Sequence, residues 1–299
     1  MNRNNAIIIY NSVPYFKEKF IEKDIPCFKM YKDLPLFLKV FRKVSLKLNF
    51  FKSIWFDDWV YELDHIDAVI VFSTNPFETV DEIYKRNPKV QIVFWYWNPI
   101  LTKGIKPFQI SDEKCDKWSF DENDCKKFNL KQNTSFYFDN ITLPINEIIN
   151  DVVFLGVDKG RRNDLNSIEK EFISLGLKTK FHIVDDNWND KNYTGDKTPI
   201  SYEKYLEMLS RSKAILDFVQ VGQSGLTLRP FESIFLNKKL ITNDTELIKQ
   251  DFYNPENVFI LGYNSIENLK KFIDSPFIPV KEDIKNKYDV INWLDRFFK

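Results

Sequence analysis

Short apolar runs bounded by polar or turn residues recur along the chain. Most are rich in Val, Ile and Phe, and most are continuous rather than alternating with polar residues. Continuous apolar runs of this length predict strands that are buried on both faces, as in a parallel sheet. The predicted strands are Ala6–Tyr10, Ala68–Phe72, Val90–Trp95, Phe136–Phe138, Val152–Leu155, Lys180–Val184, Ala214–Phe218, Lys239–Thr242 and Val258–Leu261.

Helix-like stretches separate these runs. They are Pro76–Arg86, Glu122–Phe128, Asn163–Leu175, Ser201–Ser212, Pro230–Leu236 and Ser265–Ile273. Strands that alternate with helices are typical of βαβ units and doubly wound parallel sheets, so the pattern predicts an α/β fold.

The pattern favours two such sheets over one. A polar, proline-containing stretch at 140–146 follows the first set of runs, and Val152-Val-Phe-Leu-Gly156 restarts the pattern as a new first strand. We therefore predict a boundary near residue 148, with one Rossmann-like domain at 1–148 and a second at 149–299. The stretch Glu282–Lys299 is amphipathic and predicts a terminal helix that packs on a neighbouring element.

Composition narrows the functional classes. The 299 residues carry 43 Lys+Arg and 43 Asp+Glu, and this zero net charge argues against a protein that binds nucleic acid by neutralising phosphates. No apolar run reaches the ~18 residues that a membrane-spanning helix needs. The first residues lack signal-peptide architecture, so we expect a cytoplasmic location. Three unclustered cysteines and two histidines make a structural zinc site improbable.

The first candidate site follows the strand at Val152–Leu155. In open α/β sheets ligands bind beyond the carboxyl ends of strands, and here the chain continues as Gly156-Val-Asp-Lys-Gly160-Arg161-Arg162. A glycine allows close backbone approach, and two arginines followed by a helix N-terminus suit a phosphate. The alternative is a tight turn with two solvated arginines.

The second candidate site follows the strand at Ala214–Phe218. The chain continues from Asp217 through a polar glycine loop to Arg229-Pro-Phe-Glu232. The loop amides and the Thr227 hydroxyl can hold a diphosphate, Arg229 offers a planar charge, and Glu232 can accept two hydroxyl hydrogen bonds from a ribose. The alternative is a glycine-containing connection in which Glu232 only favours the helix N-terminus.

The segment Gly225-Leu-Thr-Leu-Arg-Pro-Phe-Glu232, with the strand-like Leu240-Ile-Thr that follows, resembles the donor site of GT-B glycosyltransferases. The likeness is greatest to bacterial enzymes of surface-polysaccharide biosynthesis (capsule and lipopolysaccharide), and it spans most of residues 115–265. It implies two Rossmann-like domains that face a cleft, with the C-terminal helix packed back on the N-terminal domain. The implied donor-binding residues are Gly156, Arg161, Arg162, Asp217, Gln223, Gly225, Leu226, Thr227, Arg229 and Glu232, with Arg229 also stabilising the leaving group.

Two departures from the family pattern matter. Gln223 stands near the position where many retaining members have an acidic residue, and the loop is about two residues longer, which leaves the stereochemical outcome open. The chain also has no Asp-x-Asp triplet, the motif that holds a metal ion in GT-A enzymes. We therefore predict a metal-independent site that uses Arg161, Arg162 and Arg229, with no cofactor besides the nucleotide-sugar co-substrate.

The N-terminal half is then expected to bind the acceptor. Asn11, Trp97 and Asn98 follow predicted strands; an indole face can stack on a sugar while an amide reads its hydroxyls. The alternatives are core packing for the neighbouring Trp95 and a loop turn at Asn98. Asp121 is a candidate general base, but an aspartate directly before the helix Glu122–Phe128 more often caps it.

The sequence thus favours a glycosyltransferase that moves a sugar from a nucleoside-diphosphate sugar to a hydroxyl of a glycan or lipid-linked glycan. The alternatives are a glycosyltransferase-like binding subunit without turnover, and another nucleotide-using enzyme such as an epimerase. The epimerase is disfavoured because no Gly-x-Gly-x-x-Gly follows Ala6–Tyr10.

One further pattern points to a membrane surface. Apolar residues recur at alternating spacings of three and four, at Leu34, Phe37, Phe41, Val44, Leu48 and Phe51. Basic residues lie among them, at Lys39, Arg42, Lys43, Lys47 and Lys52, and positions 34–54 contain no acidic residue. An amphipathic helix of this kind can lie in an anionic membrane interface, which would make the protein peripheral on the inner face of the plasma membrane. The alternative is that the apolar stripe packs on the N-terminal sheet.

Overall fold

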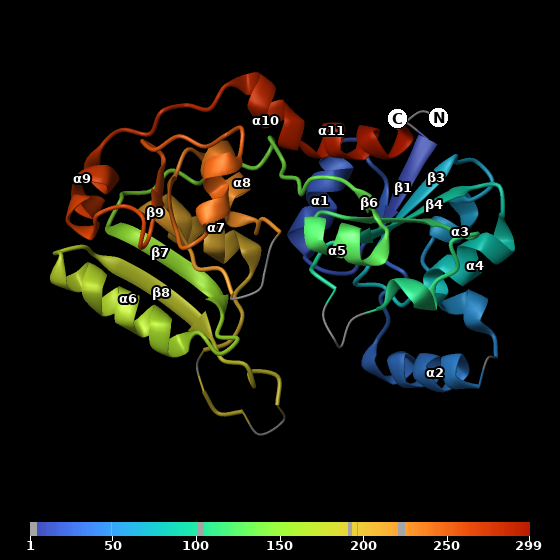
Figure 1. Cartoon of the computed structure of the whole chain (residues 1–299). Coiled ribbons are helices and arrows are strands. Elements are labelled where there is room, and N and C mark those ends of the chain that lie inside the picture. Colours follow the sequence, from blue (N-terminus) through green and yellow to red (C-terminus); the bar gives the residue numbers. More distant parts are fainter. Residues whose placement is uncertain (1–4, 49, 101–104, 191–192, 196, 221–224) are drawn as a thin grey trace. The chain divides into compact units, whose positions relative to one another are not determined.

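The computed structural model describes residues 5–48, 50–100, 105–190, 193–195, 197–220 and 225–299. It contains two parallel sheets with helices between the strands, which confirms the predicted α/β class (Figure 1). The chain divides into two compact units: unit 1 consists of Met1–Thr134 with Trp293–Lys299, and unit 2 of Ser135–Asn292. No helix in the described residues is long and apolar enough to cross a membrane.

Unit 1 is built on a six-stranded sheet with the order β2-β1-β3-β4-β5-β6. Its strands are β1 (Ala6–Ile9), β2 (Cys27–Phe28), β3 (Ala68–Phe72), β4 (Gln91–Tyr96), β5 (Asp116–Ser119) and β6 (Lys131–Gln132). Its helices include α1 (Pro14–Glu22), α2 (Leu36–Lys47), α3 (Trp59–Glu62), α4 (Glu78–Arg86) and α5 (Glu122–Phe128), with the 3-10 helices η2 (Lys52–Trp55) and η3 (Pro107–Gln109). The strands β1, β3 and β4 are almost entirely buried, as their continuous apolar runs predict.

The end of the chain belongs to unit 1. The fully buried ring of Trp293, in α11 (Val290–Asp295), lies 5.6 Å from the ring of Trp95 and 5.8 Å from that of Phe72, measured between centroids. Phe297, in the 3-10 helix η6 (Arg296–Phe298), packs edge-on against the same aromatic group. Of the predicted terminal helix Glu282–Lys299, only Trp293–Lys299 belongs to the N-terminal unit, and residues 282–292 belong to unit 2.

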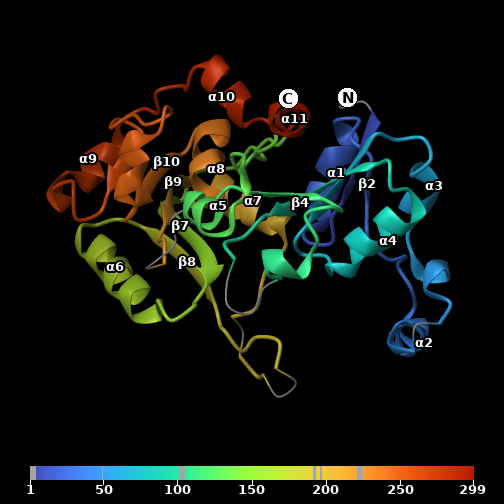
Figure 2. The same cartoon turned by 45° about the vertical axis from the view of Figure 1, so that its right-hand side comes forward.

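Unit 2 is built on a five-stranded parallel sheet with the order β11-β10-β9-β7-β8. Its strands are β7 (Asn150–Val157), β8 (Thr179–Val184), β9 (Ser212–Asp217), β10 (Lys239–Thr242) and β11 (Val258–Ile260). Its helices include α6 (Arg162–Ser174), α7 (Tyr202–Ser210), α8 (Arg229–Leu236), α9 (Leu269–Asp274) and α10 (Glu282–Tyr288), with the 3-10 helices η4 (Thr245–Lys249) and η5 (Ile266–Asn268). Figures 1 and 2 show α6 lying along β7 and β8. Along the chain, β8 is added on one side of β7 and β9 on the other, so the strand order reverses between β7 and β9. We call this place the switch point, and open α/β sheets bind their ligands there.

The division between the units comes earlier than the predicted boundary near residue 148. Phe136–Phe138 was expected to be the last strand of the first sheet, but Tyr137 forms only an isolated bridge with Asp289. The Tyr137 ring packs on Phe235 of α8, with centroids 5.4 Å apart, so this buried segment belongs to unit 2. An apolar run in a sequence indicates that the segment is buried, but it does not show that the segment pairs in a sheet. Three consecutive buried aromatic residues therefore resemble a strand in the sequence.

Candidate functional site at the switch point of unit 2

The turn that follows β7 brings the chain directly from strand to helix. Lys159 and Gly160 both adopt left-handed backbone conformations, with φ of 50° and 78°, and the Arg161 amide donates to the Asp158 carbonyl over 3.0 Å. A glycine takes up this conformation without a steric penalty, which explains Gly160. Helix α6 then begins at Arg162, so its N-terminus lies at the carboxyl end of the sheet.

Arg161 joins the ends of the two strands that flank the switch point. Its guanidinium donates to the carbonyl of Val157 at the end of β7 over 2.8 Å and to that of Phe218, the residue after β9. Within the described part of the chain Arg161 forms no ion pair, and its hydrogen bonds go to carbonyl oxygens. Burial lowers the pKa of Arg161, and the nearby carboxylates of Asp217, Asp158 and Asp186 oppose that shift. A guanidinium that is held by carbonyl oxygens and not by a direct ion pair is suited to an anionic ligand.

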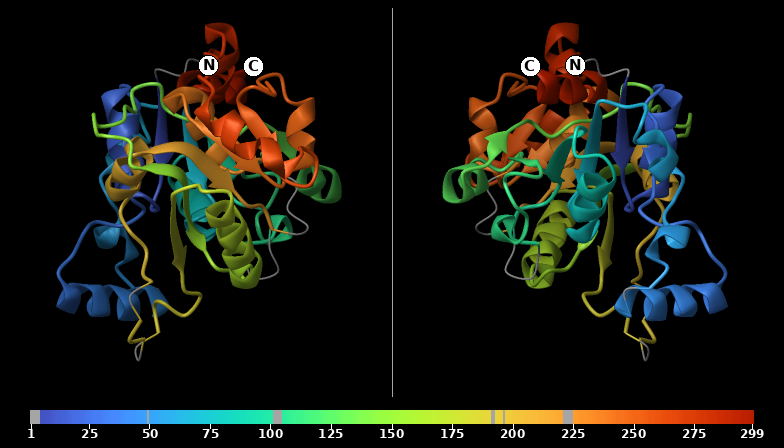
Figure 3. Two further views of the ribbon diagram at one scale, coloured as in Figure 1. Left: turned by 90° about the vertical axis from the view of Figure 1, so that its left-hand side faces the viewer. Right: turned by 90° about the vertical axis from the view of Figure 1, so that its right-hand side faces the viewer.

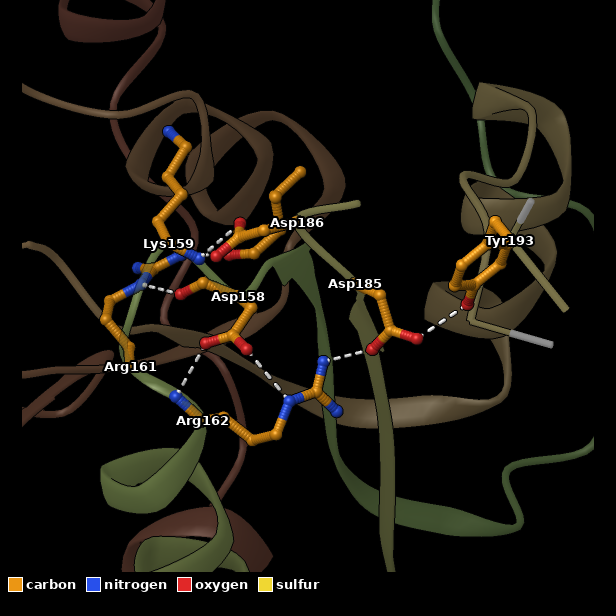
Figure 4. Close-up of polar contacts among 8 residues, drawn as sticks. Asp158, Lys159, Arg161, Arg162, Asp185, Asp186 and Tyr193 are labelled. Atoms are coloured by element: carbon orange, nitrogen blue, oxygen red, sulfur yellow. Dashed lines mark hydrogen bonds and ion pairs between the residues drawn. The ribbon is translucent and has the colours of Figure 1, made fainter. Parts of the chain in front are cut away.

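Arg162, in contrast, is neutralised inside the protein (Figure 4). Its guanidinium donates to Asp158 over 2.8 Å and also pairs with Asp185, which accepts a 2.6 Å hydrogen bond from Tyr193. The Arg162 amide donates to Asp158 as well, over 2.8 Å. The Arg162 side chain thus connects the β7 turn to the segment after β8, and its role as a phosphate ligand stays a prediction.

Lys159 is a basic residue of this turn that the sequence analysis did not select. Its amide donates to Asp186 over 2.9 Å, which fixes the backbone, and burial lowers the pKa of its ammonium group (Figure 4). No ion pair to its ammonium is found among the described residues. The signal that could have found it is its position between the glycines of a loop after a strand.

At the start of α8, polar side chains close the turn on themselves. Thr227 donates its hydroxyl hydrogen to Asp217 over 2.9 Å and accepts from the Arg229 amide over 3.2 Å. Asp217 is only 5% exposed, and burial raises its pKa to about 6. The Thr227 hydroxyl was expected to hold a diphosphate, but its proton is already bound by Asp217.

The largest departure from expectation is at Glu232. Its carboxylate is completely buried and accepts from the hydroxyls of Tyr202 and Tyr205, each over 2.8 Å, and from Arg229 over 2.5 Å. A buried carboxylate is stable only when its oxygens have such partners. These donors engage both oxygens, so Glu232 is part of a buried network in this structure, and its contact with a ribose stays a prediction.

Arg229 is held by the same network. Its second guanidinium nitrogen donates to the Leu155 carbonyl in β7 over 2.9 Å, and the guanidinium lies 4.4 Å from the centroid of the Tyr205 ring. Its charge is paired with that of Glu232, and its role in stabilising a leaving group stays a prediction. Arg229 fixes the start of α8 against β7.

The remaining predicted donor residues differ in position. Gly156 lies within β7, and a Cβ there would come within 3.0 Å of the Phe154 ring and 3.6 Å of Arg161. Gly225 is buried and Leu226 half-buried just before α8, while Gln223 lies outside the described residues. Asn243, which follows β10, was missed by the sequence analysis. Its amide side chain accepts from the Val219 amide over 2.7 Å and donates to the Val219 carbonyl over 3.1 Å, so it fixes the chain after β9.

In unit 1 the predicted acceptor residues follow β1 and β4. The Asn11 side chain accepts from the Met30 amide over 3.0 Å, Trp97 is half-buried with its ring 5.5 Å from that of Phe72, and Asn98 is exposed. The neighbouring Trp95 is fully buried, as its core alternative predicts. The packing of Trp97 leaves its stacking role a prediction.

Asp121 is the N-cap of α5. Its carboxylate accepts from the Asp124 amide over 3.0 Å and its side chain is 3% exposed. The capping alternative is confirmed, and the assignment of this buried group as a general base stays a prediction. No group of three or more His, Cys, Asp or Glu side chains in the described ranges is arranged to hold a metal ion.

Comparison with known proteins adds little to this geometry. No protein-family model matches the chain, and no curated protein matches it. A solved structure described as the crystal structure of TarM is similar over 77% of this chain, with 13% sequence identity and a TM-score of 0.47. The matched part covers 54% of that structure, so this chain spans about half its length. A likeness this distant assigns neither a family nor an activity.

Proposed function

We propose that the protein is a glycosyltransferase that moves a sugar from a nucleoside-diphosphate sugar to a hydroxyl of a surface-glycan acceptor. The proposed enzyme is of the GT-B type. It binds the donor on unit 2 and the acceptor on unit 1, where Trp97 and Asn98 are the candidate contacts. The proposal also includes acceptors of the capsule or lipopolysaccharide type, either lipid-linked or free oligosaccharide, and a cytoplasmic location at the inner face of the plasma membrane.

The observation that supports it best is the guanidinium of Arg161 between the ends of β7 and β9, which forms no direct ion pair among the described residues. Three backbone carbonyls fix it in place, so it needs no reorganisation to meet an anion. Lys159 lies in the same turn and adds positive charge, and the N-terminus of α6 follows directly, where the first amide, that of Arg162, already donates to Asp158. This combination suits the diphosphate of a nucleotide sugar better than a neutral sugar or a cation.

The residues of the turn supply the chemistry in this proposal. During transfer the bond between the anomeric carbon and the diphosphate oxygen breaks while the acceptor oxygen forms a bond to that carbon and loses its proton. Negative charge therefore grows on the diphosphate, and Arg161 and Lys159 stabilise it more strongly in the transition state than in the ground state. Because these cations fill the role of a metal ion, the proposed reaction is metal-independent.

The experiment that tests the proposal is a panel of nucleotide sugars scored by thermal shift. A ligand that binds the folded state raises the melting temperature with its concentration, and the account predicts that one nucleotide class does so. Incubation with the stabilising nucleotide sugar then separates the alternatives: an enzyme releases the nucleoside diphosphate, whereas a binding subunit without turnover does not. No stabilisation by any nucleotide sugar contradicts the proposal.

A further inference from the structure

Helix α2 carries an apolar face that nothing in the described part of unit 1 covers. Leu36 is 80% exposed and Phe37 and Phe41 are each 63% exposed, while Ser45 is the only buried residue of the helix. The alternative, that this stripe packs on the N-terminal sheet, is therefore wrong. In all three cartoon figures the helix stands apart from the sheet of its own unit, and Figure 3 shows this from two sides.

The contacts that hold α2 to unit 1 come mainly from its polar side. Arg42 donates to the Lys32 carbonyl over 3.2 Å and lies 4.8 Å from the centroid of the Tyr31 ring. Ser45 accepts a 2.8 Å hydrogen bond from the Trp55 indole and donates to the Phe50 carbonyl. The helix is thus anchored by polar groups with its apolar side facing outward, the reverse of an ordinary surface helix.

The exposed side chains form one continuous apolar arc with a basic edge. At about 100° per residue, Phe37, Val40, Phe41, Val44 and Leu48 fall within an arc of roughly 100°. Three exposed lysines continue from one edge of that arc around the helix: Lys47 lies about 20° beyond the edge, Lys43 about 60° and Lys39 about 100°. The segment after the helix adds three more exposed apolar side chains, at Phe50, Phe51 and Ile54.

We infer that α2, together with Phe50, Phe51 and Ile54, is a docking surface for an anionic lipid bilayer. An apolar patch of this kind needs an occupant, and the charge of the helix selects it: Lys39, Lys43 and Lys47 are exposed, and positions 34–54 have no acidic residue. Arg42 is bound to unit 1, and Glu78, Asp81 and Glu82 line a pocket with Phe51, Lys52 and Ser53, so the three lysines of the helix supply the charge that selects an anionic surface. The apolar arc would enter the interface while the lysines beyond its edge reach the phosphates. This inference adds to the proposed function the surface and the lipid charge that bring the enzyme to a lipid-linked acceptor.

Flotation of the full-length protein with vesicles tests the inference. We expect binding to vesicles of phosphatidylglycerol and phosphatidylcholine, weaker binding at high salt, and little binding to phosphatidylcholine alone. The triple variant Lys39→Glu, Lys43→Glu and Lys47→Glu should bind about 100-fold more weakly, at roughly a factor of five per lysine. The double variant Phe37→Ser and Phe41→Ser should also lose most binding, because it removes apolar area without changing charge.

Matched variants on other surfaces keep the result specific. Lys170→Glu, Lys270→Glu and Lys271→Glu make the same change of charge at exposed positions of unit 2, and Phe108→Ser with Ile173→Ser removes two exposed apolar side chains elsewhere. These controls should bind vesicles like the wild type. The inference is overturned if the α2 variants bind vesicles as well as the wild type does. It is also overturned if the wild type does not float with the vesicles at any lipid composition. A dimer in solution that only the α2 variants abolish, without lipid binding, identifies a second copy as the occupant and also overturns it.

The docking surface and the proposed glycosyltransferase function can be refuted independently of each other. Thermal stabilisation by a nucleotide sugar is measured without lipid, so loss of vesicle binding in the α2 variants should leave it unchanged. A protein that binds vesicles but no nucleotide retains the docking surface and loses the proposed function.

Discussion

Replacing Glu232 by glutamine tests whether this carboxylate is a buried structural charge, as the geometry indicates, or a ligand-binding group. The substitution keeps the shape of the side chain and removes its charge. In the wild type one carboxylate oxygen accepts from Tyr202, and the other accepts from both Tyr205 and Arg229. A glutamine can present its carbonyl to only one of these positions, so an amide donor faces a hydroxyl at the other.

The expected loss of unfolding free energy follows from the charge that Glu232→Gln leaves without a partner. The guanidinium of Arg229 loses its only ion-pair partner in the described structure, and its side chain is 18% exposed. Removing one member of a fully buried pair costs about 3–5 kcal/mol, and the slight exposure of Arg229 reduces this to about 2–4 kcal/mol of unfolding free energy. Urea unfolding followed by circular dichroism measures this loss.

Glu207→Gln is the matched control. Glu207 lies on α7, the helix that supplies both tyrosines, but its side chain is 56% exposed and 3.5 Å from Arg211. An exposed pair of this kind contributes at most about 0.5 kcal/mol. Adding Arg229→Met to Glu232→Gln should recover at least about 1 kcal/mol relative to the sum of the single losses, because the charge left unpaired is then gone. If Glu232→Gln loses no more stability than Glu207→Gln, the structural assignment of this carboxylate is refuted.

Two further predictions concern protonation and metal ions. Asp217 has a pKa of about 6 in the fold against an ordinary value of 3.8, so the folded state binds its proton more tightly, and its contribution to stability falls as the pH rises from about 4 to 6. In urea unfolding, Asp217→Asn should therefore have the same free energy of unfolding as the wild type near pH 4, and a free energy about 2–3 kcal/mol higher above pH 7. A difference that stays constant across this pH range would contradict the raised pKa. Transfer activity should survive EDTA because cationic side chains take the place of a metal ion on the diphosphate, and loss on chelation that manganese or magnesium restores would show that a metal is needed.

The sheets were predictable because most of their strands are buried on both faces. The continuous apolar runs at Ala68–Phe72 and Lys239–Thr242 appear as strands with the same bounds. The strands that were missed, β2 and β6, have only two residues each, and β5 carries Asp116 and Lys117 in a run of four. Such short or polar strands have no period that distinguishes them from loops.

The position of the candidate site was predictable, but the roles of its side chains were not. The turn after β7 and the loop after β9 meet as the carboxyl-end rule requires, and Arg161 bridges them. Glu232 and Arg162 lie at this edge too, yet their partners come from α7 and from the segment after β8. One sequence does not show that Tyr202, 30 positions before Glu232, donates to that carboxylate. An acidic or basic residue at a strand end is thus a candidate ligand only after its own neighbours are known.

The measurement that tests the central claim most directly is calorimetric titration of a nucleoside-diphosphate panel into the wild type, Arg161→Met and Arg211→Met. Arg211 is an arginine of the same unit that pairs with Glu207 away from the switch point, so its loss controls for a change of net charge. The account predicts that one diphosphate binds the wild type and Arg211→Met equally, and binds Arg161→Met about 30- to 100-fold more weakly, the loss expected for one charged hydrogen-bonding partner. Equal binding by Arg161→Met, with a melting temperature that shows it to be folded, contradicts a donor site at the ends of β7 and β9.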